Sequence, residues 1–167
     1  MKKISILKAL VDYLWIVTVP IGTLLIIAFI PGIFFIDFDE KSIDFLDISI
    51  QENVYSKLLL AIKVASYLLI LYAFHLFRNV LRSFQRIKIF DPIVISNFTR
   101  IGTLLILAGI VSFVISLIIR VYFKGTIGIT FGFNNDIVLI GLGLFFQILG
   151  EVFKIAKAAK EENELTI

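Results

Sequence analysis

The chain has 167 residues and a net charge of +3, and 59% of its residues are hydrophobic. A soluble domain is usually about 45–50% apolar, so this composition indicates a protein of the lipid bilayer. The small positive excess does not indicate direct nucleic-acid binding, because most basic residues flank apolar runs, and the absence of cysteine excludes disulfides and thiolate chemistry.

Four apolar runs follow one another, at about residues 13–35, 58–77, 101–123 and 137–156. About 20 helical residues cross the hydrocarbon core of a bilayer, so each run is long enough to span it once. The first run is too long for the apolar part of a signal peptide, and we expect it to stay as a span. The predicted fold class is an all-α integral membrane protein: one domain, residues 1–167, forming a bundle of four transmembrane helices.

The first and third connections carry a pattern that favours extended chain. The segment Ile43–Ile50 is rich in β-branched and aromatic residues and lies in an acidic loop. The segment Lys124–Asp136 has Thr, Ile and Phe with interspersed Gly, and we expect it to end in a turn at Asn134-Asn135. We predict that these two outer loops pair as a small extracytoplasmic β element.

The second connection, residues 78–100, is basic. Arg78, Arg82 and Arg86 repeat every four residues, so we expect the second span to continue as a helix with one basic face. Asp91-Pro92 is typical of a helix start. We expect the chain to leave the membrane near Phe153 without breaking the last helix, which gives a tail at residues 157–167.

The distribution of Lys and Arg predicts the orientation, because cytoplasmic segments carry an excess of both. The two ends and the 78–100 loop hold eleven of these residues: Lys2, Lys3, Lys8, Arg78, Arg82, Arg86, Lys88, Arg100, Lys154, Lys157 and Lys160. The other side holds four: Lys41, Lys57, Arg120 and Lys124. We therefore expect both termini in the cytoplasm.

Ionisable residues inside a span are candidates for function. Helix rise predicts an inner polar cluster near the cytoplasmic level, made of Asp12, His75, Arg78, Arg100, Gln147 and Glu151. Gly143, Gln147 and Glu151 share a helix face, which we expect to point into the bundle. Three interpretations stay open: salt bridges that lock the helix ends, a proton- or ligand-responsive switch with His75 as sensor, and a proton pathway.

The loop and tail together predict a cytoplasmic docking surface, made of Arg82, Arg86, Lys88, Lys154, Lys157, Leu165 and Ile167. Its basic residues also suit anchoring to anionic headgroups, at about 1 kcal/mol per Lys or Arg. In the third span, Ala108, Ser112 and Ser116 repeat every four residues, which favours close packing within the monomer or in a homo-oligomer.

Two stretches carry a resemblance. The run Lys88–Gly102 and the tail Glu151–Ile167 resemble blocks of a bacterial membrane protein family catalogued as domain of unknown function 2975. The matching positions are Phe90, Asn97, Arg100 and Gly102, then Glu151, Phe153, Glu162, Asn163, Leu165 and Thr166. The resemblance implies a four-span protein of the bacterial cytoplasmic (inner) membrane with no assigned activity. Genes of this family often lie beside one for a small helix-turn-helix regulator, which implies a cytoplasmic DNA-binding partner.

We expect no enzyme activity, cofactor or metal, because the chain has one His, no Cys and no nucleophile or phosphate-binding motif. The leading hypothesis is a regulatory or interaction membrane protein that docks a soluble partner. One alternative is a small transporter or channel component acting as an oligomer. Another is an envelope-stress or immunity protein whose acidic outer loop meets a cationic peptide.

Overall fold

The computed structural model describes residues 2–35, 54–87, 89–123 and 135–165, and within these ranges every regular element is an α-helix. The helices are α1 (Lys2–Phe35), α2 (Val54–Gln85), α3 (Pro92–Phe123) and α4 (Asn135–Leu165). Each contains a stretch long and apolar enough to cross a membrane, with mean hydropathy from 1.5 in α1 to 2.6 in α3. The prediction of an all-helical chain with four such helices is confirmed.

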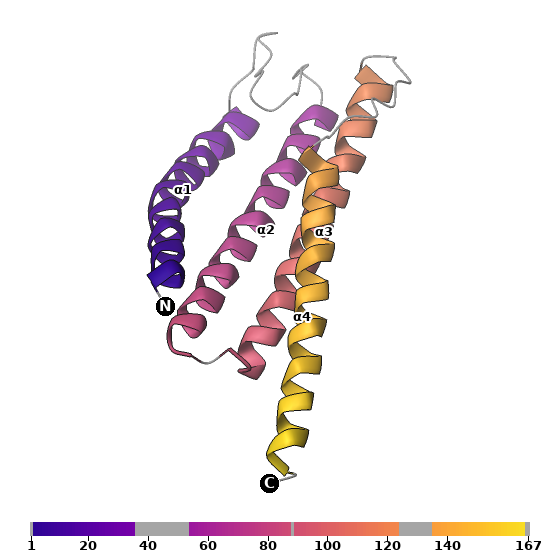
Figure 1. Cartoon of the computed structure of the whole chain (residues 1–167). Helices are drawn as coiled ribbons and strands as arrows, with labels where there is room; N and C mark the ends of the chain where they lie inside the picture. Colours follow the sequence, from indigo (N-terminus) through magenta and orange to yellow (C-terminus); the bar gives the residue numbers. More distant parts are fainter. Residues whose placement is uncertain (1, 36–53, 88, 124–134, 166–167) are drawn as a thin grey trace.

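The helices follow one another as neighbours in space (Figure 1). Within the described residues α3 packs against both α2 and α4, whereas α1 packs against α2 only. The start of α1, the link between α2 and α3 and the end of α4 lie at the same end of the molecule, and α4 extends beyond the others there (Figure 1). Residues distant in sequence therefore meet at this end.

Local signals account for the helix ends on either side of the α2–α3 link. The side chain of Asp91 accepts a hydrogen bond from the backbone N–H of Ile93 at 2.9 Å, and Pro92 is the first residue of α3. This is the predicted N-cap, with proline where its missing N–H costs nothing. α2 continues past Phe77, as expected, but ends at Gln85, so Arg86 lies just beyond the helix.

The last helix begins earlier than the sequence suggested. Asn135 is the first residue of α4, so the expected turn at Asn134-Asn135 is wrong for Asn135. A carboxylate at Asp136 in the first helical turn suits the positive end of the helix dipole. Of the two segments predicted to form the β element, 43–50 and residues 124–134 of the segment 124–136 lie outside the described residues, and Asn135 and Asp136 are helical. At its other end α4 runs unbroken past Phe153 to Leu165, which confirms the predicted continuity.

The core lies between α2, α3 and α4 and is rich in aromatic rings. Phe98 of α3 stacks on Phe153 and Phe146 of α4, with ring centroids 5.3 and 6.0 Å apart. Phe77 of α2 meets Phe146 edge to face at 5.6 Å. Because lipid tails are as apolar as these side chains, the helices associate through close packing rather than the hydrophobic effect, and ring pairs of this kind add about 0.5–1.5 kcal/mol each.

Candidate functional site

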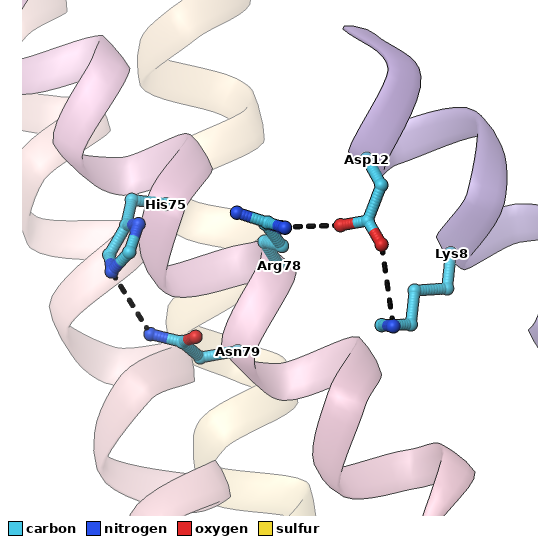
Figure 2. A network of polar contacts seen from close by, with 5 residues as sticks. All are labelled: Lys8, Asp12, His75, Arg78 and Asn79. Carbon is cyan, nitrogen blue, oxygen red and sulfur yellow. Dashed lines mark hydrogen bonds and ion pairs between the residues drawn. The ribbon is translucent and has the colours of Figure 1, made fainter. Parts of the chain in front are cut away.

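An ion-pair network joins α1 to α2 close to the start of α1, and Figure 2 shows its side chains. The Arg78 Nε donates a hydrogen bond to Asp12 Oδ1, and the Lys8 Nζ lies 3.3 Å from Asp12 Oδ2. The side chains of Asp12 and Arg78 are each 25% exposed and that of Lys8 is 21% exposed. One carboxylate thus faces two cations, and the three groups together carry a net positive charge.

The network forms because the residue spacing puts the groups on facing surfaces. Lys8 and Asp12 are one turn apart on α1, so their side chains project from the same face. Asp12 is an acceptor only, and with two partners both of its oxygens are used. The same α1–α2 seam continues to Gly22, where an added Cβ would lie 3.2 Å from Leu71.

His75 lies beside this network, one turn away from Asn79. The Asn79 Nδ2 is 3.3 Å from His75 Nε2 (Figure 2). With an amide donor at Nε2, a neutral ring would carry its proton on Nδ1. The centroid of the Trp15 ring lies 5.2 Å from that of the His75 ring. The same tryptophan stacks on the Phe74 ring, with the two centroids 6.0 Å apart. His75 is therefore held between an amide and an aromatic ring.

The remaining members of the predicted inner cluster lie on the other helix pair. The Gln147 Nε2 is 3.4 Å from the Thr103 hydroxyl, which joins α4 to α3. Arg100 is exposed, and Glu151 is exposed with its carboxylate 3.4 Å from Lys154 Nζ. The six residues expected as one cluster are thus divided, because α1 packs on α2 within the described residues and leaves α3 and α4 apart from Asp12.

The expected inward face of α4 is correct in part. Gly143 is buried and Gln147 is half-buried, but Glu151 is exposed. The physical reason is helix rotation: residues four apart advance by 400°, so each step of four turns the face by about 40°. The third-span stripe stays within the bundle, since Ala108 is fully buried, Ser112 and Ser116 are half-buried, and the Ser116 hydroxyl lies 3.4 Å from Asp136 of α4.

The predicted docking residues cluster at the end where α4 projects. Arg82, Arg86 and Lys154 are exposed, Lys157 is half-buried, and Leu165 is 86% exposed. Lys88 and Ile167 lie outside the described residues. The projecting helix is stabilised by ion pairs one turn apart, Lys157–Glu161 and Lys160–Glu164, each at 3.5 Å.

One contact ties the projecting helix to the α2–α3 link. The Lys160 Nζ lies 5.7 Å from the centre of the Phe90 ring, within range of a cation–π interaction. The ring of Phe153 lies 6.3 Å from that of Phe90. Phe90 of the link is therefore in contact with α4 through both Lys160 and Phe153.

An apolar groove was missed by the sequence analysis. It has a volume of about 300 Å³ and lies between α2, α3 and α4. Its lining is apolar throughout: Ile70, Ala73, Phe74, Phe77, Ile101, Leu105, Leu139, Leu142 and Phe146. A groove between three helices produces no periodic pattern in the sequence. The apolar residues that each helix contributes to it cannot be distinguished by their spacing from residues of the buried core.

The outer surface identifies the class of protein. Large apolar side chains are exposed along α1, α3 and α4, including Ile16 (66%) and Ile148 (63%), and such surfaces would not be left in water. Four neighbouring apolar helices with an apolar exterior define a multi-pass membrane protein.

The chain belongs to the family described as "Protein of unknown function (DUF2975)", which matches residues 8–167 and confirms the resemblance carried by the central loop and the tail. No curated protein and no solved structure matches the chain. Within the described residues, no group of three or more His, Cys, Asp or Glu side chains is arranged to hold a metal ion.

Proposed function

We propose that this protein is a regulatory or interaction protein of the bacterial cytoplasmic (inner) membrane, which docks a soluble partner on its cytoplasmic face. It acts by binding rather than by catalysis. The partner proposed is a small helix-turn-helix transcription regulator, since genes for such regulators often accompany this family. The observation that carries the proposal is the projecting end of α4, an exposed charged helix that ends in an 86% exposed Leu165.

Charge supports the orientation in this proposal. The sequence assigns eleven Lys and Arg to the two ends of the chain and the 78–100 loop, against four on the other side. The structure brings the start of α1, the α2–α3 link and the end of α4 to one end of the molecule. Segments with this bias stay in the cytoplasm during membrane insertion. Both termini and the projecting helix would then be available to a cytoplasmic protein.

The form of the tail supports a role in binding. Its charges are already paired along the helix, Lys157 with Glu161 and Lys160 with Glu164, so the helix is stabilised without a partner. A preformed helix loses less conformational entropy on binding than a disordered tail would. Leu165 offers an apolar anchor at its tip, and Arg82 and Arg86 are exposed cations at the same end of the molecule.

The test is capture of the neighbouring regulator by the detergent-solubilised chain, with and without residues 158–167. We expect the shortened chain to insert normally and to lose the regulator. Leu165→Ser is expected to weaken capture, whereas Glu161→Gln, which removes one intrahelical ion pair and keeps the anchor, is expected to retain it. Capture that is unchanged by the deletion, or no capture by the whole chain, would overturn the proposal.

A further inference from the structure

The apolar groove runs lengthwise beside α2 and is open at its side. Its α2 wall extends from Ile70 to Phe77, seven residues apart, which is about 10 Å of helix. A volume of about 300 Å³ over that length corresponds to a cross-section of about 30 Å². A helix of a second copy, about 10–12 Å in diameter, has a cross-section of roughly 80–110 Å² and does not fit. A single hydrocarbon chain is the narrow apolar shape that suits this groove.

One end of the groove leads toward the ion-pair network. Phe74 lines the groove, and Arg78 is one helical turn further along the same face of α2. Phe74 also stacks on Trp15 of α1, and Asp12 is three residues before that tryptophan. Trp rings are enriched where hydrocarbon meets headgroups. The groove and the charged network are therefore linked through Phe74 and Trp15, and together they form one column along α2.

The charges at this end suit an anion. Lys8 and Arg78 outnumber Asp12, the one acidic side chain that they contact among the described residues. Arg78 uses its Nε for Asp12, and no bond of its two terminal nitrogens is found within the described part of the chain. Figure 2 shows the far end of the guanidinium directed away from Asp12. With Arg78 25% exposed, these N–H groups are placed to bind a phosphate oxygen.

We propose that this column is a binding site for an anionic phospholipid. One acyl chain occupies the groove between α2, α3 and α4, and the phosphate lies at Lys8 and Arg78. An acyl chain in the groove makes van der Waals contacts with the apolar lining, and an empty groove would lack these contacts. The headgroup supplies the negative charge that the network lacks. This site does not depend on the docking of a soluble partner at the projecting helix.

The test measures lipid retention by the purified full-length chain, using native mass spectrometry with phosphatidylglycerol and phosphatidylcholine of identical acyl chains. We expect one phosphatidylglycerol to be retained in preference to phosphatidylcholine. Lys8→Gln keeps the Asp12–Arg78 pair and removes one cation, and we expect it to weaken phosphatidylglycerol binding about fivefold. Lys57→Gln is the control, because Lys57 is a cation near the opposite end of α2 and is no part of the network or of the docking surface.

A second pair of variants tests the groove. Leu142 lines the groove and is partly exposed, so Leu142→Trp fills it from the rim without disturbing the buried core. Loss of two buried methylene contacts corresponds to about tenfold weaker binding, and we expect at least that effect. Leu144→Trp, on an exposed position outside the groove, is the control and should bind as the original chain does.

Each outcome decides the proposal. Equal retention of the two lipids, or equal effects of Lys8→Gln and Lys57→Gln, would overturn the headgroup site. Equal retention by the Leu142 and Leu144 variants would overturn the acyl-chain site. Thermal unfolding of every variant is measured in parallel, so that a misfolded protein is recognised, and the conservative Lys8→Arg variant is expected to restore phosphatidylglycerol binding.

Discussion

Gly102 of α3 and Gly143 of α4 lie face to face. The backbone at each glycine occupies the space that a side chain at the other glycine would need. A Cβ added to Gly102 would lie 2.6 Å from the carbonyl oxygen of Gly143, and one added to Gly143 would lie 2.8 Å from that of Gly102. The contact recurs along the seam, since a Cβ on Gly109 would lie 2.9 Å from the carbonyl oxygen of Asp136. Small residues of this kind let two helices pack closely within a membrane.

This relationship predicts the effect of adding one methyl group at the seam. Gly143→Ala is expected to destabilise the protein by about 1–3 kcal/mol, because the added Cβ meets backbone that cannot turn aside. Unfolding of the detergent-solubilised protein by increasing denaturant measures the change. Gly141→Ala is the control, since nothing lies within 4 Å of its added Cβ. At residue 141 the substitution should be neutral or stabilising by up to about 1 kcal/mol. Equal losses of stability at residues 141 and 143 would contradict the close packing of α3 against α4.

The pair Asp12–Arg78 predicts a second effect, confined to α1. Asp12→Asn is expected to reduce stability by about 1–2 kcal/mol, because the pair is three-quarters shielded and its loss leaves Arg78 unbalanced. Since α1 packs against α2 alone among the described helices, the loss should appear as release of α1. Spin-label distances between α1 and α2 would lengthen while those between α3 and α4 would stay.

A charge-matched control accompanies this prediction. Glu151→Gln removes a carboxylate whose pair with Lys154 is about two-thirds exposed, and it should cost less than about 0.5 kcal/mol. The reversed pair, Asp12→Arg with Arg78→Asp, should recover part of the lost α1–α2 contact. If Glu151→Gln and Asp12→Asn had the same effect on the α1–α2 distance, the ion pair would not be what holds α1.

The sequence predicts the depth of a residue along its helix better than it predicts which residues of other helices it contacts. Counting residues along each helix placed Asp12 and Arg78 at one depth, and the structure pairs them. The same count placed Glu151 at that depth, yet it is exposed on another helix pair. Depth follows from the fixed rise of a helix, whereas the facing direction depends on helix rotation and on which helices pack together, and neither follows from span lengths.

The glycine seam shows a signal that was present but not used. Gly102 and Gly109 are seven residues apart on α3, and so are Gly143 and Gly150 on α4. A spacing of seven keeps a helix face aligned more closely than a spacing of four, because seven residues make nearly two full turns. The four-residue series that includes Gln147 and Glu151 drifts off the seam, which is why its last member is exposed.

The end of α2 yields a third prediction. Ile87 has a φ of 59°, in the left-handed region, where a β-branched residue is strained, and its N–H bonds to the carbonyl of Phe84 at 3.1 Å. Glycine is the residue that this helix end favours. Ile87→Gly is expected to raise the free energy of unfolding by about 1 kcal/mol. Ile89→Gly, at a nearby exposed position without positive φ, should not raise the free energy of unfolding. A lower free energy of unfolding in Ile87→Gly would show that Ile87 is not strained.

The orientation gives the last prediction, and the absence of cysteine makes it simple to measure. Single cysteines at Arg86 and Leu165 are expected to react with a membrane-impermeant maleimide only after the cells are permeabilised, because the basic excess predicts that this end is cytoplasmic. A cysteine at Glu52, in the acidic first loop, is expected to react in intact cells. A reversed pattern would place the projecting helix outside the cell, and no cytoplasmic regulator could then reach it.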